Sequence, residues 1–259
     1  MVNKEQFLKL AQNDEDRRFL SYILDKQNAC LNKNIYTASH FLDAHQQGLL
    51  LQHLSHFAVK PILWGGYPEA ERKMAFFLPD YLEEAPTEAI SLLQVSHHAP
   101  KPPTHRDYLG SAIGLGLSRD GIGDILVSPG GAQLLIRKDL ENYFLSNYCS
   151  AGRVSLSTEI LPLSALSLPL QATREKTVTL ASLRADAAIA AAFTVSRALA
   201  AEAIAHGLVY INDLPVSKSG QAVSAGDKLK WQGHGRAILT EIGGQSRKGR
   251  NFATFRIFI

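Results

Sequence analysis

The sequence is poor in the features that mark secreted, membrane or metal-binding proteins. Its 259 residues include only two cysteines, Cys30 and Cys149, which stand far apart. Two isolated cysteines provide neither a disulfide framework nor a zinc site, which predicts a reducing, cytoplasmic location. No segment approaches the roughly 18–20 uninterrupted apolar residues of a membrane span. The N-terminus has early acidic residues in place of an apolar signal core, so we expect no membrane partner.

Sequence signatures of catalysis are also missing. The glycines from Gly114 to Gly121 lack the G-x-G-x-x-G spacing, and they follow a predicted helix rather than a strand. There is no Walker A motif, and His97, His98 and His105 lack a carboxylate or cysteine at metal-ligand spacing. No Ser-His-Asp or Cys-His arrangement can be placed. We predict no catalytic residues, no metal, no cofactor and no small-molecule substrate, and therefore that the protein is not an enzyme.

The chain as a whole has almost no excess of positive over negative charge, but its C-terminal third does. The chain has 27 Lys+Arg and 24 Asp+Glu, a net charge of +3. Residues 174–259 hold 12 basic and 6 acidic residues, net +6, and residues 1–173 hold the other 15 and 18, net −3. A small basic domain is typical of nucleic-acid binding, although an ordinary solvated surface also fits this excess.

Hydrophobic periodicity predicts an α+β protein of three domains. Residues 1–82 form a mainly helical unit that ends in strands, with Thr37 and Ser39 directly before its third helix. Residues 88–165 follow the order β-α-β-β-α-β, which is the ferredoxin-like, or RRM-like, pattern. Its candidate central strand, 133–137, has no aromatic residue, so we expect the RRM-like fold without RRM-type base stacking.

The third domain, residues 174–259, is joined to the second by an extended connection at 161–173. It is predicted to contain two helices, at 183–193 and 196–206. Strand candidates follow these helices, and the last two flank a basic hairpin turn at the C-terminus.

A spaced motif in this third domain points to RNA. Its parts are Arg184-Ala185-Asp186, Ser196-Arg197, Gly207 after the second helix, Ile211-Asn212 and Gly226-Asp227. This order resembles the S-four RNA-binding domain. The sequence departs from that family at Ala185, where leucine is usual, and at Asp213, where glycine often follows the asparagine. The resemblance implies binding of structured RNA.

Two arginines are the leading candidates for RNA contact. Arg184 begins the first helix and Arg197 the second, so both guanidinium groups and both helix N-termini are expected to face one surface that favours phosphate. The alternative for both is a structural ion pair with Asp186, and Ser196 is either a plain N-cap or an RNA ligand. Further candidates are the basic residues Lys218, Lys228, Lys230 and Arg236 and, in the hairpin turn, Arg247, Lys248 and Arg250. The alternative for the hairpin turn is a mobile, soluble loop.

The whole chain resembles the bacterial YlmH-type family. The stretches that carry the resemblance are Thr37 to Asp43 (TASHFLD), Gly65 to Arg72 (GGYPEAER) and His105 to Gly110 (HRDYLG). The resemblance implies an N-terminal region, an RRM-like middle domain and an S-four domain. It also implies rRNA and tRNA as partners on the large ribosomal subunit, in quality control of stalled peptidyl-tRNA complexes.

The leading hypothesis is thus a non-enzymatic RNA-binding factor of the large ribosomal subunit. A second hypothesis is an RNA-modifying enzyme that uses the S-four domain for docking. A third is an adaptor in cell division, because the family is also associated with genes near the division cluster.

Overall fold

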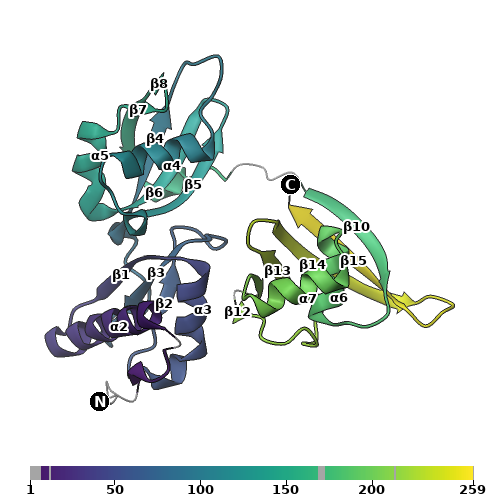
Figure 1. The fold of residues 1–259 in the computed structure, drawn as a ribbon. Helices are drawn as coiled ribbons and strands as arrows, with labels where there is room; N and C mark the ends of the chain where they lie inside the picture. The colour runs from purple at the N-terminus through teal and green to yellow at the C-terminus, as the bar shows by residue number, and fades with distance from the viewer. Residues whose placement is uncertain (1–6, 12, 169–172, 213, 259) are drawn as a thin grey trace. The chain divides into compact units, whose positions relative to one another are not determined.

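The structure, a computed structural model, describes residues 7–11, 13–168, 173–212 and 214–258 (Figure 1). It divides into two compact units, Met1–Pro169 and Leu170–Ile259. The helices of the first unit are α2 (Asp14–Lys33), α3 (Ala44–Gln52), α4 (His105–Gly114) and α5 (Glu141–Asn147). Its strands are β1 (Thr37–Leu42), β2 (Ile62–Trp64), β3 (Lys73–Phe77), β4 (Ile90–Ser96), β5 (Ile122–Ser128), β6 (Gly131–Arg137), β7 (Ser150–Ala151), β8 (Val154–Ser155) and β9 (Ser157–Leu161).

The first part of this unit is a three-stranded antiparallel sheet, in the order β1-β3-β2, packed against α2 and α3. The predicted start of the third helix after Thr37 and Ser39 is wrong, because residues 37–42 form strand β1. Helix α3 begins instead after Asp43, which forms a capping box with Gln46. Strand β1 lacks a simple alternation of apolar and polar residues, because the adjacent residues Phe41 and Leu42 are both buried. They belong to two different cores.

The second part has the ferredoxin-like fold that the sequence predicts. Its antiparallel sheet has the order β5-β6-β4-β9, with an added β7–β8 hairpin before the last strand. Tyr108 of α4 and Phe144 of α5 pack with the buried side chains of one sheet face. The other face carries Leu92 and Leu135, which pack against Phe76 of β3.

A buried carboxylate joins the two parts of the first unit. Asp124, on β5, accepts hydrogen bonds from the Tyr67 hydroxyl at 2.7 Å and from the backbone N–H groups of Glu71 and Arg72 at 2.7 and 3.0 Å. The Arg72 guanidinium in turn donates to the Phe41 carbonyl at 2.6 Å. The segment GGYPEAER is therefore a structural tie between the two sheets. The predicted domain boundary between residues 82 and 88 stays a prediction, since these sheets share a core.

The second unit is one twisted sheet covered on one face by two helices (Figure 1). The helices are α6 (Ala185–Phe193) and α7 (Arg197–Ala205). The strands are β10 (Thr173–Leu180), β11 (Val209–Ile211), β12 (Leu214–Pro215), β13 (Lys228–Trp231), β14 (Gly235–Gln245) and β15 (Asn251–Phe258), in the sheet order β10-β15-β14-β13-β11-β12. Both helices agree with prediction, whereas strand β10 was not predicted.

Among the described helices, none is both long and apolar enough to cross a membrane alone. The pair α6 and α7 reaches the required length and composition together, but the two are bent by 117° where they join.

Candidate nucleic-acid interface

The two leading arginines converge on one buried carboxylate. Asp186, whose side chain is 9% exposed, accepts a hydrogen bond from Arg197 Nη2 at 2.7 Å, and Arg184 Nε lies 3.5 Å from its other oxygen. That second oxygen also accepts from the Ala187 N–H at 2.8 Å. The arginine side chains are themselves 47% and 54% exposed. A guanidinium has five N–H donors, so each arginine can serve Asp186 and a second anion together.

The expected role of the α6 N-terminus is corrected by the structure. Its first two N–H groups, on Ala185 and Asp186, donate to the carbonyls of Gln221 and Ser219 at 2.8 and 3.1 Å. These amides are therefore used inside the domain and do not form a phosphate site. The same loop packs on Arg184, since a Cβ added at Gly220 would lie 3.1 Å from its Nη2 atom. Lys218, a predicted candidate, belongs to this loop.

Ser196 acts as an N-cap. Its hydroxyl accepts a hydrogen bond from the Leu199 N–H at 3.2 Å, with extended backbone angles at Ser196. This cap fixes the start of α7 and so the direction in which Arg197 leaves the helix. Ser196, Arg184, Arg197 and Lys218 are called the helix-side cluster below.

The other predicted residues lie elsewhere on the domain. Leu229 and Trp231 face the core under the helices, so the alternating residues Lys228 and Lys230 of β13 face the opposite side of the sheet. Arg236 of β14 pairs in register with Lys230, and its guanidinium lies 5.2 Å from the ring centre of Phe258. The sequence could not separate these residues from the helix-side cluster because the sheet's orientation depends on distant contacts.

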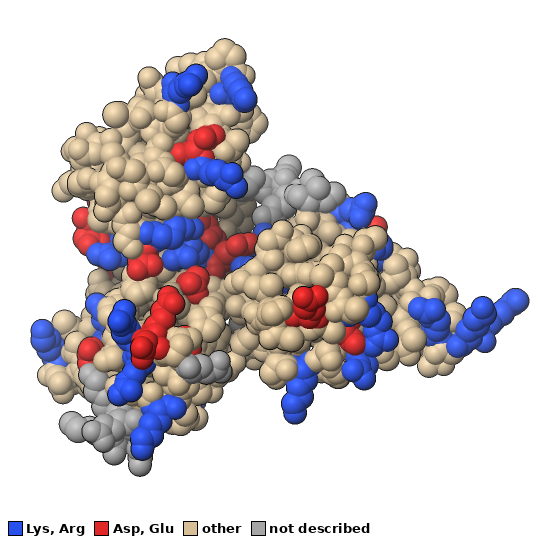
Figure 2. Space-filling model, viewed as in Figure 1, with Lys and Arg blue, Asp and Glu red and all other residues tan. Residues whose placement is uncertain are grey.

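The hairpin turn between β14 and β15 holds the last three candidates. It is closed by hydrogen bonds from the Ser246 N–H to the Arg250 carbonyl and from the Gly249 N–H to the Ser246 carbonyl, both at 2.8 Å. No acidic residue occurs after Glu241 in the sequence. In Figure 2 the outer end of this hairpin shows Lys and Arg side chains with no Asp or Glu beside them in that view. We call Arg247, Lys248 and Arg250 the hairpin tip.

The RRM-like sheet face is occupied by the chain itself. In an RRM, this face stacks bases on aromatic side chains. Here Leu92 and Leu135 are fully buried in the shared core. Gln133, on the same sheet, donates to the Ala165 carbonyl at 3.1 Å and accepts from the Ser167 N–H at 2.7 Å. The missing aromatic residue in this strand thus has a physical reason, since the face packs against protein.

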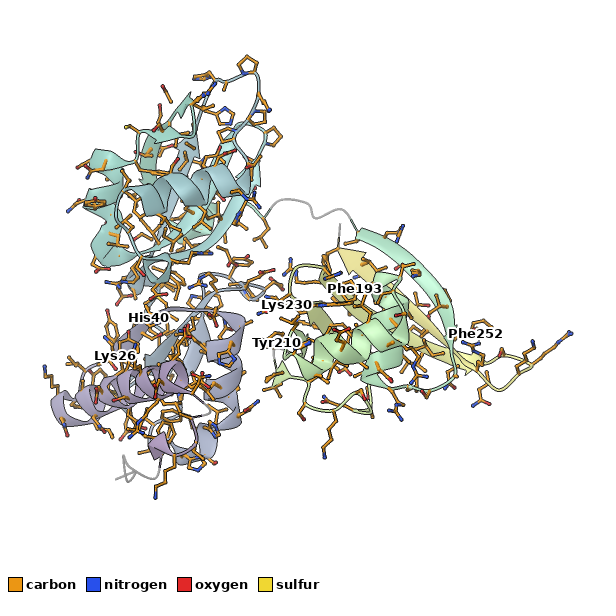
Figure 3. The ribbon with its side chains drawn as sticks, in the orientation of Figure 1. Lys26, His40, Phe193, Tyr210, Lys230 and Phe252 are labelled. Atoms are coloured by element: carbon orange, nitrogen blue, oxygen red, sulfur yellow. The ribbon has the colours of Figure 1, made fainter. Side chains whose placement is uncertain are left out.

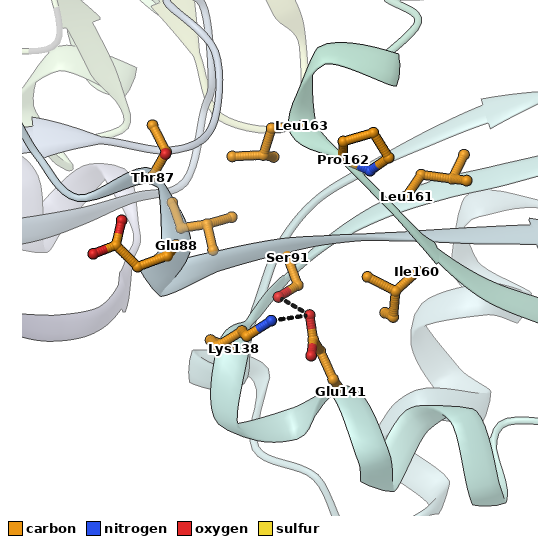
Figure 4. A pocket seen from close by; sticks show the side chains of 10 residues that line it. Thr87, Glu88, Ser91, Lys138, Glu141, Ile160, Leu161, Pro162 and Leu163 are labelled. Carbon is orange, nitrogen blue, oxygen red and sulfur yellow. Dashed lines mark hydrogen bonds and ion pairs between the residues drawn. The ribbon is translucent and has the colours of Figure 1, made fainter.

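A hollow of about 330 Å³ in the first unit is lined by apolar side chains and by charged ones that include Glu88, Lys138 and Glu141 (Figure 4). Glu141 on its wall accepts hydrogen bonds from Ser91 at 2.5 Å and Lys138 at 2.8 Å. Although burial alone would raise it, these two donors hold the pKa of Glu141 below its usual value. The carboxylate is thus internally satisfied. Within the described part of the chain, no group of three or more His, Cys, Asp or Glu side chains is arranged to hold a metal ion.

Comparison with known proteins matches two domain families in this chain. Residues 90–165 match the family described as "Putative RNA-binding domain in YlmH", and residues 183–229 match the family described as "S4 domain". The chain is 31% identical over 245 residues to the Bacillus subtilis (strain 168) protein named "Ribosome-associated protein quality control protein P2", covering 93% of this chain and 95% of that protein. A solved structure, "Cell division protein ylmH from Streptococcus pneumoniae", is 24% identical with a TM-score of 0.49, covering 60% of this chain and 95% of that one.

Proposed function

Because the chain belongs to the YlmH-type family of RNA-binding proteins, we propose that it is a non-enzymatic factor that binds rRNA and tRNA on the large ribosomal subunit. Its role is to act in quality control of stalled peptidyl-tRNA complexes in the cytoplasm. The printed name of the Bacillus subtilis relative supports the ribosomal setting. The match of residues 183–229 and the net charge of +6 on residues 174–259 support RNA as the ligand.

The observation that carries this proposal is the pairing of Arg184 and Arg197 with Asp186. A free arginine side chain loses rotamer entropy when it binds phosphate. Here the buried carboxylate already orients both guanidinium groups while about half of each arginine side chain remains exposed. Their remaining donors are preorganised for the phosphates of a folded RNA, whose recognition depends mainly on backbone contacts.

The test removes both cations without leaving a buried charge unpaired. Removing the arginines alone would strand the Asp186 carboxylate and destabilise the domain, so the variant is Arg184→Gln, Arg197→Gln and Asp186→Asn together. Its binding to purified large ribosomal subunits is measured by cosedimentation at several salt concentrations. We expect affinity to fall at least tenfold and the slope of log K against log salt to fall by about two.

The matched control is Asp186→Asn alone, which keeps both cations and a hydrogen-bonding side chain between them. It should keep the salt slope of the unaltered protein, because both cations remain, and should lose less affinity than the triple variant, because only the orientation of the arginines is lost. A folded triple variant, checked by thermal unfolding, that still cosediments like the unaltered protein would show that these arginines do not bind the RNA.

A further inference from the structure

Phe252 is an exposed aromatic side chain beside the hairpin tip (Figure 3). It lies on β15, and its neighbour Ala253 is buried in the core under the helices, so Phe252 faces the opposite side of the sheet. The side chain is 42% exposed. On the β14 side it lies against Gly243, where an added Cβ would be 3.4 Å from the Phe252 Cβ. Because glycine has no side chain, nothing from that position covers the outer face of the ring.

A guanidinium is anchored to the backbone of β10, the strand that pairs with Phe252. Thr179 of β10 is the cross-strand partner of Phe252, and Arg250 Nη2 donates to the Thr179 carbonyl at 2.9 Å. Arg250 precedes Phe252 by two residues, at the last position of the turn before β15. The aromatic ring and the guanidinium therefore both belong to residues that meet Thr179, where the turn joins β15.

The local charge continues in the same direction. Arg247 and Lys248 lie two to three residues further along the turn, where no acidic residue is present in the sequence. The acidic residues of β10, β14 and β15 are Glu175 and Glu241. They pair in register with Arg256 and Thr254, on the side of Phe252 away from the tip. Between the Phe252 ring and the hairpin tip, the sequence therefore has no acidic residue.

A single exposed apolar residue is ordinary in proteins. An aromatic residue opposite a strand glycine can also serve pairing alone, by covering the glycine. That structural role uses only the side of the ring next to Gly243. It does not require an adjacent anchored guanidinium or a group of cations one turn away. A flat apolar surface flanked by cations is the arrangement that binds an unpaired nucleotide, with the base stacked and the phosphates paired.

We propose that Phe252 and Arg250 form a stacking shelf for an unpaired base of the bound RNA, and that Arg247 and Lys248 hold the adjacent phosphates. This inference rests on the proposed function and extends it. The helix-side cluster binds the backbone of a folded RNA, whereas the shelf selects RNA that has a bulged or looped-out nucleotide.

The experiment compares two RNA hairpins that differ by one nucleotide. One has a fully paired stem, and the other has the same stem with a single bulged 2-aminopurine, whose fluorescence reports stacking. The full-length protein should bind the bulged hairpin about 5- to 150-fold more tightly, which is the range for stacking one base on an aromatic side chain. Binding should also quench the 2-aminopurine.

Three variants separate stacking from structure. Phe252→Leu keeps an apolar side chain next to Gly243 but removes the aromatic ring, so it should lose both the preference and the quenching with its thermal unfolding unchanged. Phe252→Trp should retain both. Phe258→Leu removes another aromatic residue of the same strand, one that lies under Arg236, and should leave the preference intact.

The outcomes distinguish the shelf from RNA binding in general. Equal affinity of the unaltered protein for the two hairpins, or a preference that survives in Phe252→Leu, would overturn the shelf. If neither hairpin is bound, the RNA-binding proposal fails and the shelf fails with it. The triple variant at Arg184, Arg197 and Asp186 should weaken binding to both hairpins by a similar factor and keep their ratio, as a separate shelf requires.

Discussion

Two buried carboxylates show how the same residue type serves different purposes in this chain. Asp124 accepts from one hydroxyl and two backbone N–H groups, all of them neutral donors from the segment that it ties to β5. Asp186 instead pairs with two arginines whose side chains remain about half exposed. A carboxylate saturated by neutral donors stabilises a fold, whereas one that orients exposed cations prepares a binding surface. This difference singles out Asp186 as the organiser of the candidate interface.

His40 is expected to make the stability of the first unit sensitive to acid. Its ring stacks on Tyr22 with the ring centres 4.8 Å apart. Burial lowers the pKa of His40; among the nearby charges, Asp120 opposes this shift and cations reinforce it. The cations are Arg72, Arg137 and Lys26. The folded state therefore favours the neutral ring, while the unfolded chain takes up a proton near the ordinary histidine pKa of about 6.5.

The sign of the pH dependence follows from this lowered pKa. The stabilisation from His40 is complete above about pH 6.5 and is lost as the pH falls below it, by at most about 1.4 kcal/mol per pH unit for one proton. The free energy of unfolding, measured by urea denaturation between pH 7.5 and 5.5, should thus fall less in His40→Phe than in the unaltered protein. The substituted ring can still stack on Tyr22. Identical pH dependence in the two proteins would rule out His40 as a source of the acid sensitivity.

At the scale of helices and strands, the sequence predicts those elements whose signal lies within the element itself. Helices α6 and α7 follow from an alanine-rich run and a serine N-cap, and the ferredoxin-like order follows from alternating periodicities. Strand β10 was missed because it is mostly polar and pairs with β15, which is more than 70 residues away in the sequence. Thr177, for example, pairs with Thr254. Long-range pairing of this kind leaves no local signal.

The candidate site was predictable to the same extent. The residue types and the pairing partner Asp186 could be named from the motif. The sequence could not show that loop carbonyls occupy the first amides of α6. It also could not show that Lys228 lies on the sheet face away from the helices. Phe252 was not among the predicted residues, although its place in an alternating strand directly after the basic turn was a usable signal.

Two glycines of helix α4 are expected to lower the stability of the protein, and no close packing requires a glycine at either position. A Cβ added at Gly110 or Gly114 would meet no atom within 4 Å. Glycine in a helix costs about 0.5–1 kcal/mol relative to alanine, although Gly114 is the last residue of α4 and its effect is expected at the lower end. Gly110→Ala with Gly114→Ala should therefore raise the free energy of unfolding by about 1 kcal/mol in urea denaturation.

The matched control for this prediction is Gly123→Ala in the same domain. Its added Cβ would lie 2.7 and 2.9 Å from two ring atoms of Phe41, which is fully buried and cannot easily move. This substitution should destabilise the protein by about 1–3 kcal/mol. If the α4 double variant were destabilised instead, those glycines would have a role in the folded protein that their open surroundings do not reveal.

At the scale of the whole chain, the boundary between the two compact units near residue 170 also separates the acidic part of the sequence from the basic part. The compact unit from residue 170 onward contains all 12 basic residues of the basic third, for a net charge of +6, and residues 1–169 carry −3. The second unit has its own core, built from α6, α7 and the sheet. In the first unit, the sheet face that an RRM uses for RNA is packed against protein. Electrostatic attraction to RNA is thus concentrated in the second unit.

This division predicts how a fragment of residues 170–259 behaves. Because it contains a complete core and the whole positive excess, it should fold alone and bind the paired RNA hairpin with a slope of log K against log salt within about one of the full chain's slope. A fragment of residues 1–169, with net negative charge, should show no measurable binding to that hairpin at 150 mM salt. Circular dichroism would confirm folding of both fragments before binding is measured by fluorescence anisotropy. If the folded fragment of residues 170–259 has a salt slope smaller than that of the full chain by two or more, cations of the first unit also contact the RNA. Charge reversal of the exposed Arg106 or Arg153 in the full chain would then identify them.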